Sequence, residues 1–132
     1  MELTAELAEG WLPTLFMPDK ADLAFGDALK IGLSKRSSDL PPLDIVAGGM
    51  VAIGDDVKQY LDFGRPNTAL YVGGMGARGR NFYNSLVQRY GFEQEALQIQ
   101  DLYLSGKKKE AEAAVPLELL EGMNLVGPEG YI

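Results

Sequence analysis

The segment between residues 70 and 90 contains the groups with the clearest potential for chemistry. Its glycines and arginines are Gly73, Gly74, Gly76, Gly79, Arg78 and Arg80. Glycine lets backbone N–H groups approach a ligand or a neighbouring helix closely, and a helix that begins near Arg80 directs its positive end at this loop. The residues leave two interpretations open: an anion site, or tight packing at the glycines with solvated arginines, which is slightly favoured. The testable form of the first is that Arg78 and Arg80 face an anion or a carboxylate.

Part of this segment matches a nucleotide-binding fingerprint. Gly74-Met75-Gly76-Ala77-Arg78-Gly79 has the G-x-G-x-x-G spacing and follows an apolar stretch. The fingerprint needs a βαβ unit with an acidic residue that ends a second strand about 20 residues further on. Glu93 and Glu95 lie at that distance, but they open a helical pattern. The sequence therefore disfavours a dinucleotide site.

Other candidate chemistry is sparse. Asp55 and Asp56 could form an acid/base or metal pair, but adjacent side chains at a helix start diverge, so a capping role is favoured. Glu118 and Glu121 share one helix face and, without histidine or a third carboxylate, are read as a solvated face rather than a metal site. The lysines at 107–109 are read as a solvated helix start, and an anionic cofactor tail is the minor alternative.

The composition indicates a globular chain and excludes several classes of function. Of the 132 residues, 46% are hydrophobic and 23% are charged, and the net charge of −7 argues against binding to a phosphate backbone. The absence of cysteine and histidine excludes disulfides, thiolate metal sites and histidine-based catalysis. No apolar run approaches the roughly 20 residues of a membrane span. The early glutamates Glu2, Glu6 and Glu9 argue against a signal peptide, so we expect a cytoplasmic protein without nucleic-acid or membrane partners.

Apolar spacing predicts the elements that position these groups. In the first part of the chain it predicts helices over 2–9 and 22–36, a connector at 37–42, and strands over 11–16 and 43–53. From residue 56 onward the pattern is almost wholly helical. The expected helices there are 81–90, 93–104, 107–114 and 117–120, and Arg65-Pro66 marks a first helical turn. Residues 69–72 have the propensity of a strand.

A set of motifs in fixed order resembles one known family. The motifs are Gly10-Trp11-Leu12-Pro13, Asp44-Ile45-Val46-Ala47-Gly48-Gly49, Ile53-Gly54-Asp55-Asp56, Arg65-Pro66, Ala69-Leu70-Tyr71-Val72-Gly73-Gly74-Met75-Gly76, Asn81-Phe82-Tyr83-Asn84, Tyr90-Gly91-Phe92, Ile99-Gln100-Asp101-Leu102-Tyr103-Leu104 and Leu125-Val126-Gly127-Pro128. The series resembles the later part of a luciferase-like flavin or deazaflavin oxidoreductase, in the branch that depends on coenzyme F-420.

The resemblance implies an α/β fold, namely a helix-rich fragment of a (β/α)8 TIM barrel with about two parallel strands. It implies a single domain at 1–132, with strand regions 11–16 and 43–53 and a helical insertion at 55–122, and it favours helix over strand at 69–72. Such a barrel typically takes about 250 residues, and the chain has 132. We therefore expect the chain to be incomplete.

The resemblance also implies an activity and a cofactor. In such an enzyme, hydride moves between reduced coenzyme F-420 (alternatively FMN) and a small organic substrate, and the cofactor carries the chemistry. The residues implied on the cofactor side are Gly10, Trp11, Leu12, Pro13, Gly48 and Gly49, and those on the substrate side are Met75, Arg78, Asn81 and Tyr83. No catalytic residue and no metal ligand is indicated. By residue type alone, Trp11 is as compatible with a core position, and methionine usually fills gaps.

Two hypotheses follow for the chain itself. The first is a region of such an oxidoreductase that binds no deazaflavin tightly alone, because the early strands that supply most cofactor contacts are missing. The second is a non-catalytic, helix-rich assembly module or a remnant of such an enzyme. Under both hypotheses the strands have unpaired edges, which favour pairing with another strand. We therefore expect a homodimer or pairing with another barrel segment.

Overall fold

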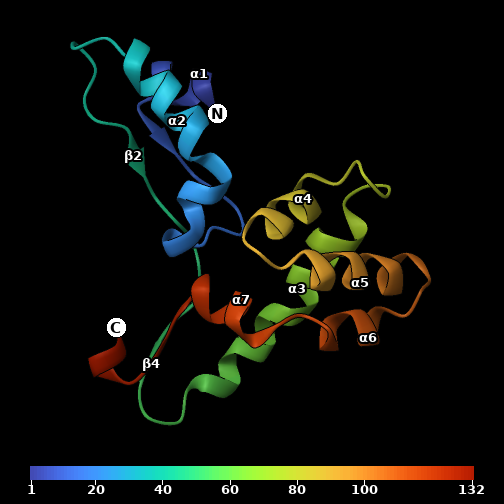
Figure 1. The fold of residues 1–132 in the computed structure, drawn as a ribbon. Helices are drawn as coiled ribbons and strands as arrows, with labels where there is room; N and C mark the ends of the chain where they lie inside the picture. Colours follow the sequence, from blue (N-terminus) through green and yellow to red (C-terminus); the bar gives the residue numbers. More distant parts are fainter.

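Helices α1 (Glu2–Leu7) and α2 (Ala21–Lys35) lie side by side at one end of the computed structural model, which describes residues 1–132 (Figure 1). Gly32 of α2 is buried where the helices meet, and a side chain there would collide with the backbone of Glu2. The absence of a side chain at this position therefore sets how closely the two helices approach. Both helices confirm the sequence prediction to within a turn.

The guanidinium group of Arg36 links the end of α1 to the segment that follows α2. Its Nη1 donates to the carbonyls of Ala5 and Ala8 at 2.8 Å each, and its Nε and Nη2 donate to the carbonyl of Pro41 at 3.0 and 2.6 Å. The last carbonyls of a helix have no partner within the helix and attract a cation. Arg36 follows α2, yet it caps the end of α1 and ties down the connector to the next strand.

Four short strands form two separate parallel pairs. β1 (Gly10–Trp11) pairs with β2 (Asp44–Ile45), and β3 (Val51–Ile53) pairs with β4 (Leu125–Gly127). Parallel strands are thus found in both predicted strand regions, and β1 and β2 pair with each other. The pairing of β4 with β3 is an addition to the two-strand prediction, and it brings the C-terminal end of the chain back to its middle.

The strand predicted over 11–16 is too long. Pairing stops at Trp11, and the chain then turns away from β2. Pro13 has no N–H to donate to a ladder, and Leu15 adopts a positive φ of 53°, which is incompatible with an extended strand. These residues form a loop instead of a strand.

The strand predicted over 43–53 is interrupted in its middle. Gly49 has a φ of 149°, and the N–H of Met50 donates to the side chain of Asn124 at 2.7 Å. The backbone therefore leaves the extended conformation after β2 and resumes it only in β3. Between the two strands it is fixed by the side-chain amide of Asn124, which follows α7. The apolar composition is right for a strand, but the glycines allow a break that the pattern does not reveal.

The rest of the chain is helical, as predicted. Its segments are η1 (Pro18–Lys20), η2 (Lys58–Gly64), α3 (Arg65–Ala69), the π-helical turn η3 (Leu70–Gly74), α4 (Phe82–Arg89), α5 (Glu93–Leu104), α6 (Lys108–Ala113), α7 (Leu117–Gly122) and η4 (Glu129–Tyr131). Residues 70–74 are helical rather than extended, which the resemblance favours. Helices α3 to α6 gather at the end of the molecule away from α1 and α2 (Figure 1).

A network of buried amides joins η3, α4 and α5. Asn81 Nδ2 donates to the carbonyls of Tyr71 and Val72 at 2.8 and 3.0 Å, while its Oδ1 accepts from the N–H groups of Tyr83 and Asn84 at 2.9 and 3.2 Å. Asn81 thereby caps the start of α4 and fixes the end of η3 with one side chain. All the hydrogen bonds of the Asn81 side chain are therefore made to backbone groups of the protein.

The second amide of the network continues it into α5. Asn84 Nδ2 donates to the carbonyls of Val72 and Ala96 at 3.0 and 2.7 Å, and its Oδ1 accepts from Gln88 Nε2 at 2.7 Å. The last carbonyls of a helical segment lack partners within it, and the two asparagines donate to those of Tyr71 and Val72 at the end of η3. The network is surrounded by apolar side chains, and the buried core consists of Met17, Phe25, Leu61, Ala69, Val72, Leu86, Val87, Tyr90, Phe92, Ala96, Ile99, Ala111, Val115, Leu119, Leu120 and Val126.

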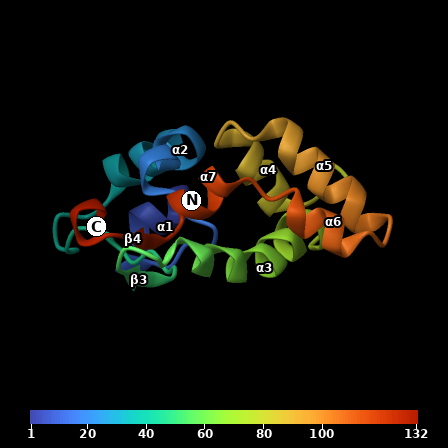
Figure 2. The same cartoon turned by 90° about the horizontal axis from the view of Figure 1, so that it is seen from below.

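The second sheet carries apolar side chains into solvent. β3 and β4 lie next to each other at the edge of the molecule (Figure 2). Val51 is 65% exposed, Ile53 58% and Leu125 52%. Each strand of this pair has one unpaired edge, since the sheet has two strands. No helix is both long and apolar enough to cross a membrane.

We predict that the isolated chain forms a homodimer, because unpaired strand edges with exposed apolar side chains favour pairing with a second copy. Sedimentation equilibrium is expected to give twice the chain mass of 14.3 kDa. Val51→Lys, in β3, should shift the equilibrium toward monomer. The matched control is Leu97→Lys, on the exposed face of α5, which should not. A 14.3 kDa species at all concentrations would exclude the dimer.

The amide network yields a stability prediction. Asn81→Ala removes a helix cap and leaves buried carbonyls without donors, so it should lower the free energy of unfolding by about 2 to 4 kcal/mol. Asn67→Ala, at an exposed position with no side-chain hydrogen bond, should change it by less than about 0.5 kcal/mol. Urea titration monitored by circular dichroism measures both. A loss below about 1 kcal/mol in Asn81→Ala would contradict the network's role.

Candidate functional site

A buried tyrosine holds the loop that follows β1. Tyr90, at the end of α4, is 1% exposed and donates its phenolic hydrogen to the carbonyl of Leu15 at 3.1 Å. Leu15 is the one non-glycine residue with a positive φ, a conformation that costs about 1 to 3 kcal/mol and persists only where the surroundings impose it. Tyr90 therefore fixes a strained turn directly after the Gly10–Pro13 motif.

The same burial affects the titration of this tyrosine. Desolvation raises the pKa of Tyr90 above its ordinary value, because the phenolate would lose its hydration, and a hydrogen bond with the backbone of Met17 offsets part of this rise. Tyr90 is therefore a neutral hydrogen-bond donor at physiological pH. Its role is to position the loop.

An aromatic cluster fixes the start of this loop. The ring of Trp11 meets those of Phe16 and Phe25 edge to face, with centroid distances of 5.5 and 4.9 Å. Trp11 is half-buried, so it packs against the core and also lines a cavity.

The larger cavity lies between this loop, the break between β2 and β3, helix α3 and the end of α7. Its volume is about 290 Å³. The residues that line it are Pro13, Thr14, Leu15, Phe16, Gly48, Gly49, Gly64, Asn67, Thr68, Leu120, Met123 and Asn124. Three of the six residues expected on the cofactor side are among them, and no lining residue is charged.

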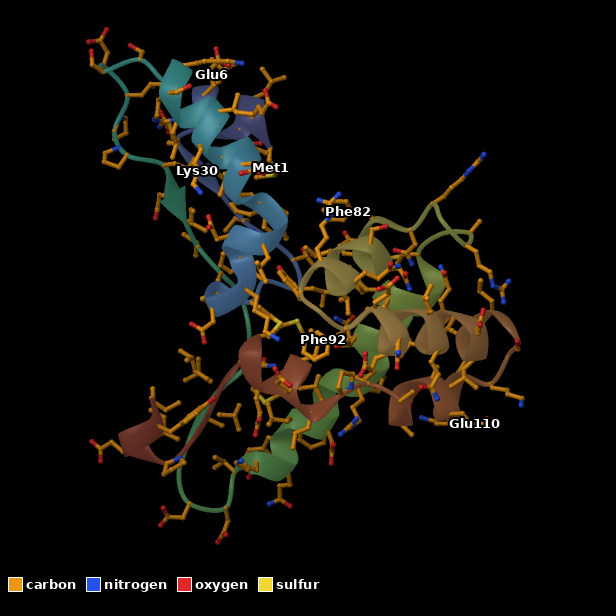
Figure 3. The ribbon with its side chains drawn as sticks, in the orientation of Figure 1. Met1, Glu6, Lys30, Phe82, Phe92 and Glu110 are labelled. Atoms are coloured by element: carbon orange, nitrogen blue, oxygen red, sulfur yellow. The ribbon has the colours of Figure 1, made fainter.

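A smaller, mostly apolar cavity lies on the other side of the loop. It has a volume of about 200 Å³ and is lined by Met1, Trp11, Leu12, Pro13, Thr14, Phe25, Phe82 and Tyr83. Phe82 extends from α4 toward α2 (Figure 3). This cavity therefore combines three residues expected on the cofactor side with Tyr83, which is expected on the substrate side. Gly10 borders neither cavity; it lies in β1 beside Asp44.

Two of the four substrate-side residues lie away from both cavities. Met75 is exposed after η3, and Arg78 is exposed in the loop before α4. Arg78 Nε donates to Asp101 Oδ1 at 2.8 Å. The prediction that Arg78 faces a carboxylate is confirmed.

The other two substrate-side residues lie at the start of α4. Asn81 is buried, and its hydrogen bonds are all with the protein backbone. Tyr83 is half-buried, packs edge to face on Tyr71 with centroids 4.7 Å apart, and borders the smaller cavity. Asn81 therefore positions Tyr83 and the helix, while Tyr83 can reach a ligand.

The prediction that Arg80 faces an anion or a carboxylate is wrong. The side chain is exposed and makes no ion pair. The first N–H groups of α4, which an anion would need, already donate to Asn81. An internal cap therefore excludes the anion site at this helix start.

Tight packing explains the glycine-rich run. A Cβ at Gly73 would lie 2.5 Å from Tyr103 Cβ, and one at Gly74 would lie 2.6 Å from the Tyr103 ring. Both glycines are needed because α5 packs directly on the π-helical turn. The packing interpretation is therefore correct for Gly73 and Gly74 and for the solvated Arg80, but not for Arg78, which pairs with Asp101.

The acidic pairs do not converge. Asp55 and Asp56 are exposed, and the predicted cap is wrong because the next helical turn begins at Lys58 without a side-chain cap. Glu118 bonds Lys20 at 3.0 Å and Glu121 bonds Lys58 at 3.0 Å, so two carboxylates on one helix reach different lysines. No group of three or more potential metal ligands is present. The lysines at 107–109 are exposed at the start of α6.

Sequence reasoning misses four polar residues of the larger cavity, namely Thr14, Asn67, Thr68 and Asn124. Asn67 and Thr68 follow Arg65-Pro66 in α3. Asn124 bonds Leu120 O and the N–H of Met50. No spacing marks these residues. Only the folding of α3 and α7 against the loop after β1 brings them together.

Comparison with known proteins assigns the family. The luciferase-like monooxygenase family matches residues 1–132. The chain belongs to this family. A protein of Mycobacterium tuberculosis that bears the provisional name coenzyme F-420-dependent oxidoreductase is 33% identical, over 98% of this chain and 38% of its own length. No solved structure matches.

Membership of the luciferase-like family explains the order of strands and helices in this chain. The family has the TIM-barrel fold, which accounts for parallel strands followed by helices, so the predicted fold class of a helix-rich α/β chain is confirmed. The chain spans 38% of the length of the curated relative it matches. Its four strands are correspondingly few for a closed barrel.

The larger cavity does not fit a complete deazaflavin cofactor. Pockets for drug-sized ligands have volumes of roughly 300 to 1,000 Å³, and this one has about 290 Å³. A phosphate-bearing tail also needs cationic partners or a free helix start. None of the lining residues is a lysine or arginine, and the start of α4 is capped by Asn81. The residues present suit a smaller, uncharged molecule.

We predict that Tyr90→Phe lowers the free energy of unfolding by about 1 kcal/mol through loss of the bond to Leu15. The raised pKa of Tyr90 also adds a pH dependence. Below about pH 10 both states keep the proton, whereas at higher pH the unfolded state loses it first and wild-type stability falls. In Tyr90→Phe, the free energy of unfolding should not show this contribution to the decline at high pH.

Urea unfolding at several pH values between 8 and 11 measures both effects. The matched control is Tyr131→Phe, because that hydroxyl is exposed and makes no hydrogen bond; its stability should equal that of the wild type at pH 8. Equal stability of Tyr90→Phe and wild type at pH 8, with the same decline at high pH, would show that Tyr90 does not hold the loop.

Proposed function

We propose that this chain forms part of a deazaflavin-dependent oxidoreductase, in which hydride moves between reduced coenzyme F-420 and a small organic substrate. The observation that carries the proposal is the position of the loop after β1. Leu12 and Pro13 of the Gly10–Pro13 motif follow the carboxyl end of the parallel strand β1, and Pro13 borders both cavities. Active sites of TIM-barrel enzymes lie at that end of the strands.

The family and the relative support the choice of chemistry. The luciferase-like match spans the whole chain, and the mycobacterial relative is named for coenzyme F-420. Deazaflavins supply the hydride chemistry themselves, so the protein has to bind, orient and exclude water. A chain without histidine or cysteine is compatible with that task. FMN is the alternative cofactor.

Each expected residue then has a limited role. Trp11 and Leu12 line the smaller cavity, Pro13 borders both cavities, and Gly48 and Gly49 line the larger one without side chains. Tyr83 presents a ring, fixed by Tyr71, to the smaller one. The chain supplies surfaces for the reactants, and we propose that the cofactor's remaining contacts come from other segments of the complete enzyme.

A second candidate function is a non-catalytic assembly module. The exposed apolar side chains of β3 and β4 favour it, because a partner that covers them would remove apolar surface from water. Val51, Ile53 and Leu125 line neither of the two cavities. Under this alternative the cavities are packing defects, and the strand edges are the functional surface.

We predict that the isolated chain does not bind coenzyme F-420 with micromolar affinity and does not turn over. The larger cavity is too small and lacks cations. Fluorescence titration of oxidised F-420 with the purified chain measures the binding. Micromolar binding with hydride transfer by the chain alone would contradict the prediction.

The native gene product separates the two candidate functions. We expect the product isolated from its source to oxidise reduced F-420 in the presence of an organic acceptor, measured by the return of deazaflavin absorbance. A native product with a chain mass of 14.3 kDa that carries no deazaflavin and does not oxidise it would favour the assembly module.

A further inference from the structure

The larger cavity is lined by a buried threonine residue whose hydroxyl group has no hydrogen-bond partner in the protein. Thr68 of α3 lines the cavity and is 3% exposed, yet its side chain makes no hydrogen bond. No fully enclosed side-chain nitrogen or oxygen of the protein lacks a partner. The hydroxyl of Thr68 must therefore be reachable from the cavity, since it is neither bonded nor fully enclosed.

The other polar groups of the cavity divide into engaged and free ones. Asn124 is engaged, since its Nδ2 donates to Leu120 O at 2.6 Å and its Oδ1 accepts from the N–H of Met50. Asn67, next to Thr68 at the rim, makes no side-chain hydrogen bond and is exposed. The hydroxyl of Thr14, in the loop after β1, also makes no hydrogen bond, but Thr14 is exposed. Among the free polar residues of the cavity, Thr68 is therefore the buried one, and Asn67 and Thr14 are exposed.

The remaining walls are apolar or backbone. Leu15, Phe16, Leu120 and Met123 contribute the hydrophobic surface, and a Cβ at Gly49 would lie 2.5 Å from Met123 O, so this wall is shaped by backbone contact. No charged side chain lines the cavity. An ion would lose its hydration there without compensation, which excludes charged ligands.

We infer that the cavity is a binding site for a small uncharged ring compound with one hydroxyl or carbonyl oxygen, which hydrogen-bonds to Thr68. The volume of about 290 Å³ exceeds that of apolar cavities of about 150 Å³ that admit benzene. The hydroxyl of Thr68 both donates and accepts, so it serves either oxygen. Asn67 selects for polar groups at the entrance.

Binding at this cavity requires neither a cofactor nor hydride transfer. The proposal therefore stands or fails independently of the proposed oxidoreductase activity. It also differs from the assembly alternative, under which the cavity is a packing defect without affinity for any ring compound.

Three probes with the same ring test the proposal, namely phenol, benzene and benzoate. Each is titrated at pH 7 into the ¹⁵N- and ¹³C-labelled 132-residue chain, and the NMR shifts of Leu15, Gly48, Gly49 and Thr68 are followed. Phenol is expected to bind saturably with a dissociation constant of millimolar order or tighter. Benzene should bind about 5- to 10-fold more weakly, and benzoate should not bind.

Two substitutions assign the hydrogen bond to Thr68. Thr68→Val keeps the shape and removes the hydroxyl, so phenol affinity should fall about 5- to 10-fold, to that of benzene, while benzene affinity is unchanged. Thr68→Ser keeps the hydroxyl and should retain the preference for phenol. If Thr68→Val does not fold, nuclear Overhauser effects between phenol and the methyl groups of Thr68 and Leu15 in the wild type decide.

Three results would overturn the inference. The first is that phenol causes no saturable shift at these four residues. The second is equal phenol affinity in Thr68→Val and wild type. The third is binding of benzoate as tight as that of phenol, which would show that charge is not excluded.

Discussion

The hydrogen bonds from two asparagines to the carbonyl of Val72 are the interaction on which the rest of this structure depends. Asn81 and Asn84 both donate to this oxygen, and Asn84 also donates to Ala96 O. Their side chains donate to the last carbonyls of η3, cap the start of α4 and bond to the backbone of α5. Because each amide is buried, losing one partner would leave the others unsatisfied in a low-dielectric interior. This coupling makes η3, α4 and α5 one unit, and Tyr90 extends that unit from the end of α4 to the loop after β1.

The two cavities follow from this arrangement. The larger one forms where the loop after β1, strained at Leu15 and fixed by Tyr90, faces α3 and the end of α7. The smaller one forms where the same loop faces α4. The strands contribute little to this scaffold, since each pair is short and the apolar side chains of β3 remain exposed. The helical part therefore supports the site, whereas the strands provide the edges at which a TIM barrel of this luciferase-like family would continue.

The helices were predictable and the cavity was not. Helical spacing is a local property, so α2, α4 and α5 are visible in the sequence, and the cap at Asn81 fits the start of α4. Strand lengths depend on partners, and the predicted strand over 43–53 overlooks the break at Gly49 because it depends on Asn124, far along the chain. The cavity lining likewise joins α3 to the loop after β1 and to α7. Of the residues implied by resemblance, Met75 and Arg78 lie away from both cavities, whereas those that border one are Trp11, Leu12, Pro13, Gly48, Gly49 and Tyr83.

Hydrogen exchange of side-chain amides tests the central claim most directly. After transfer of the ¹⁵N-labelled chain into D₂O, NMR should show the carboxamide protons of Asn81 and Asn84 persisting, because both are buried and fully bonded. The carboxamide of Asn67, exposed and unbonded, should exchange within the dead time and serves as the internal reference. Exchange of Asn81 and Asn84 as fast as that of Asn67 would show that the amide network does not hold the helical part together.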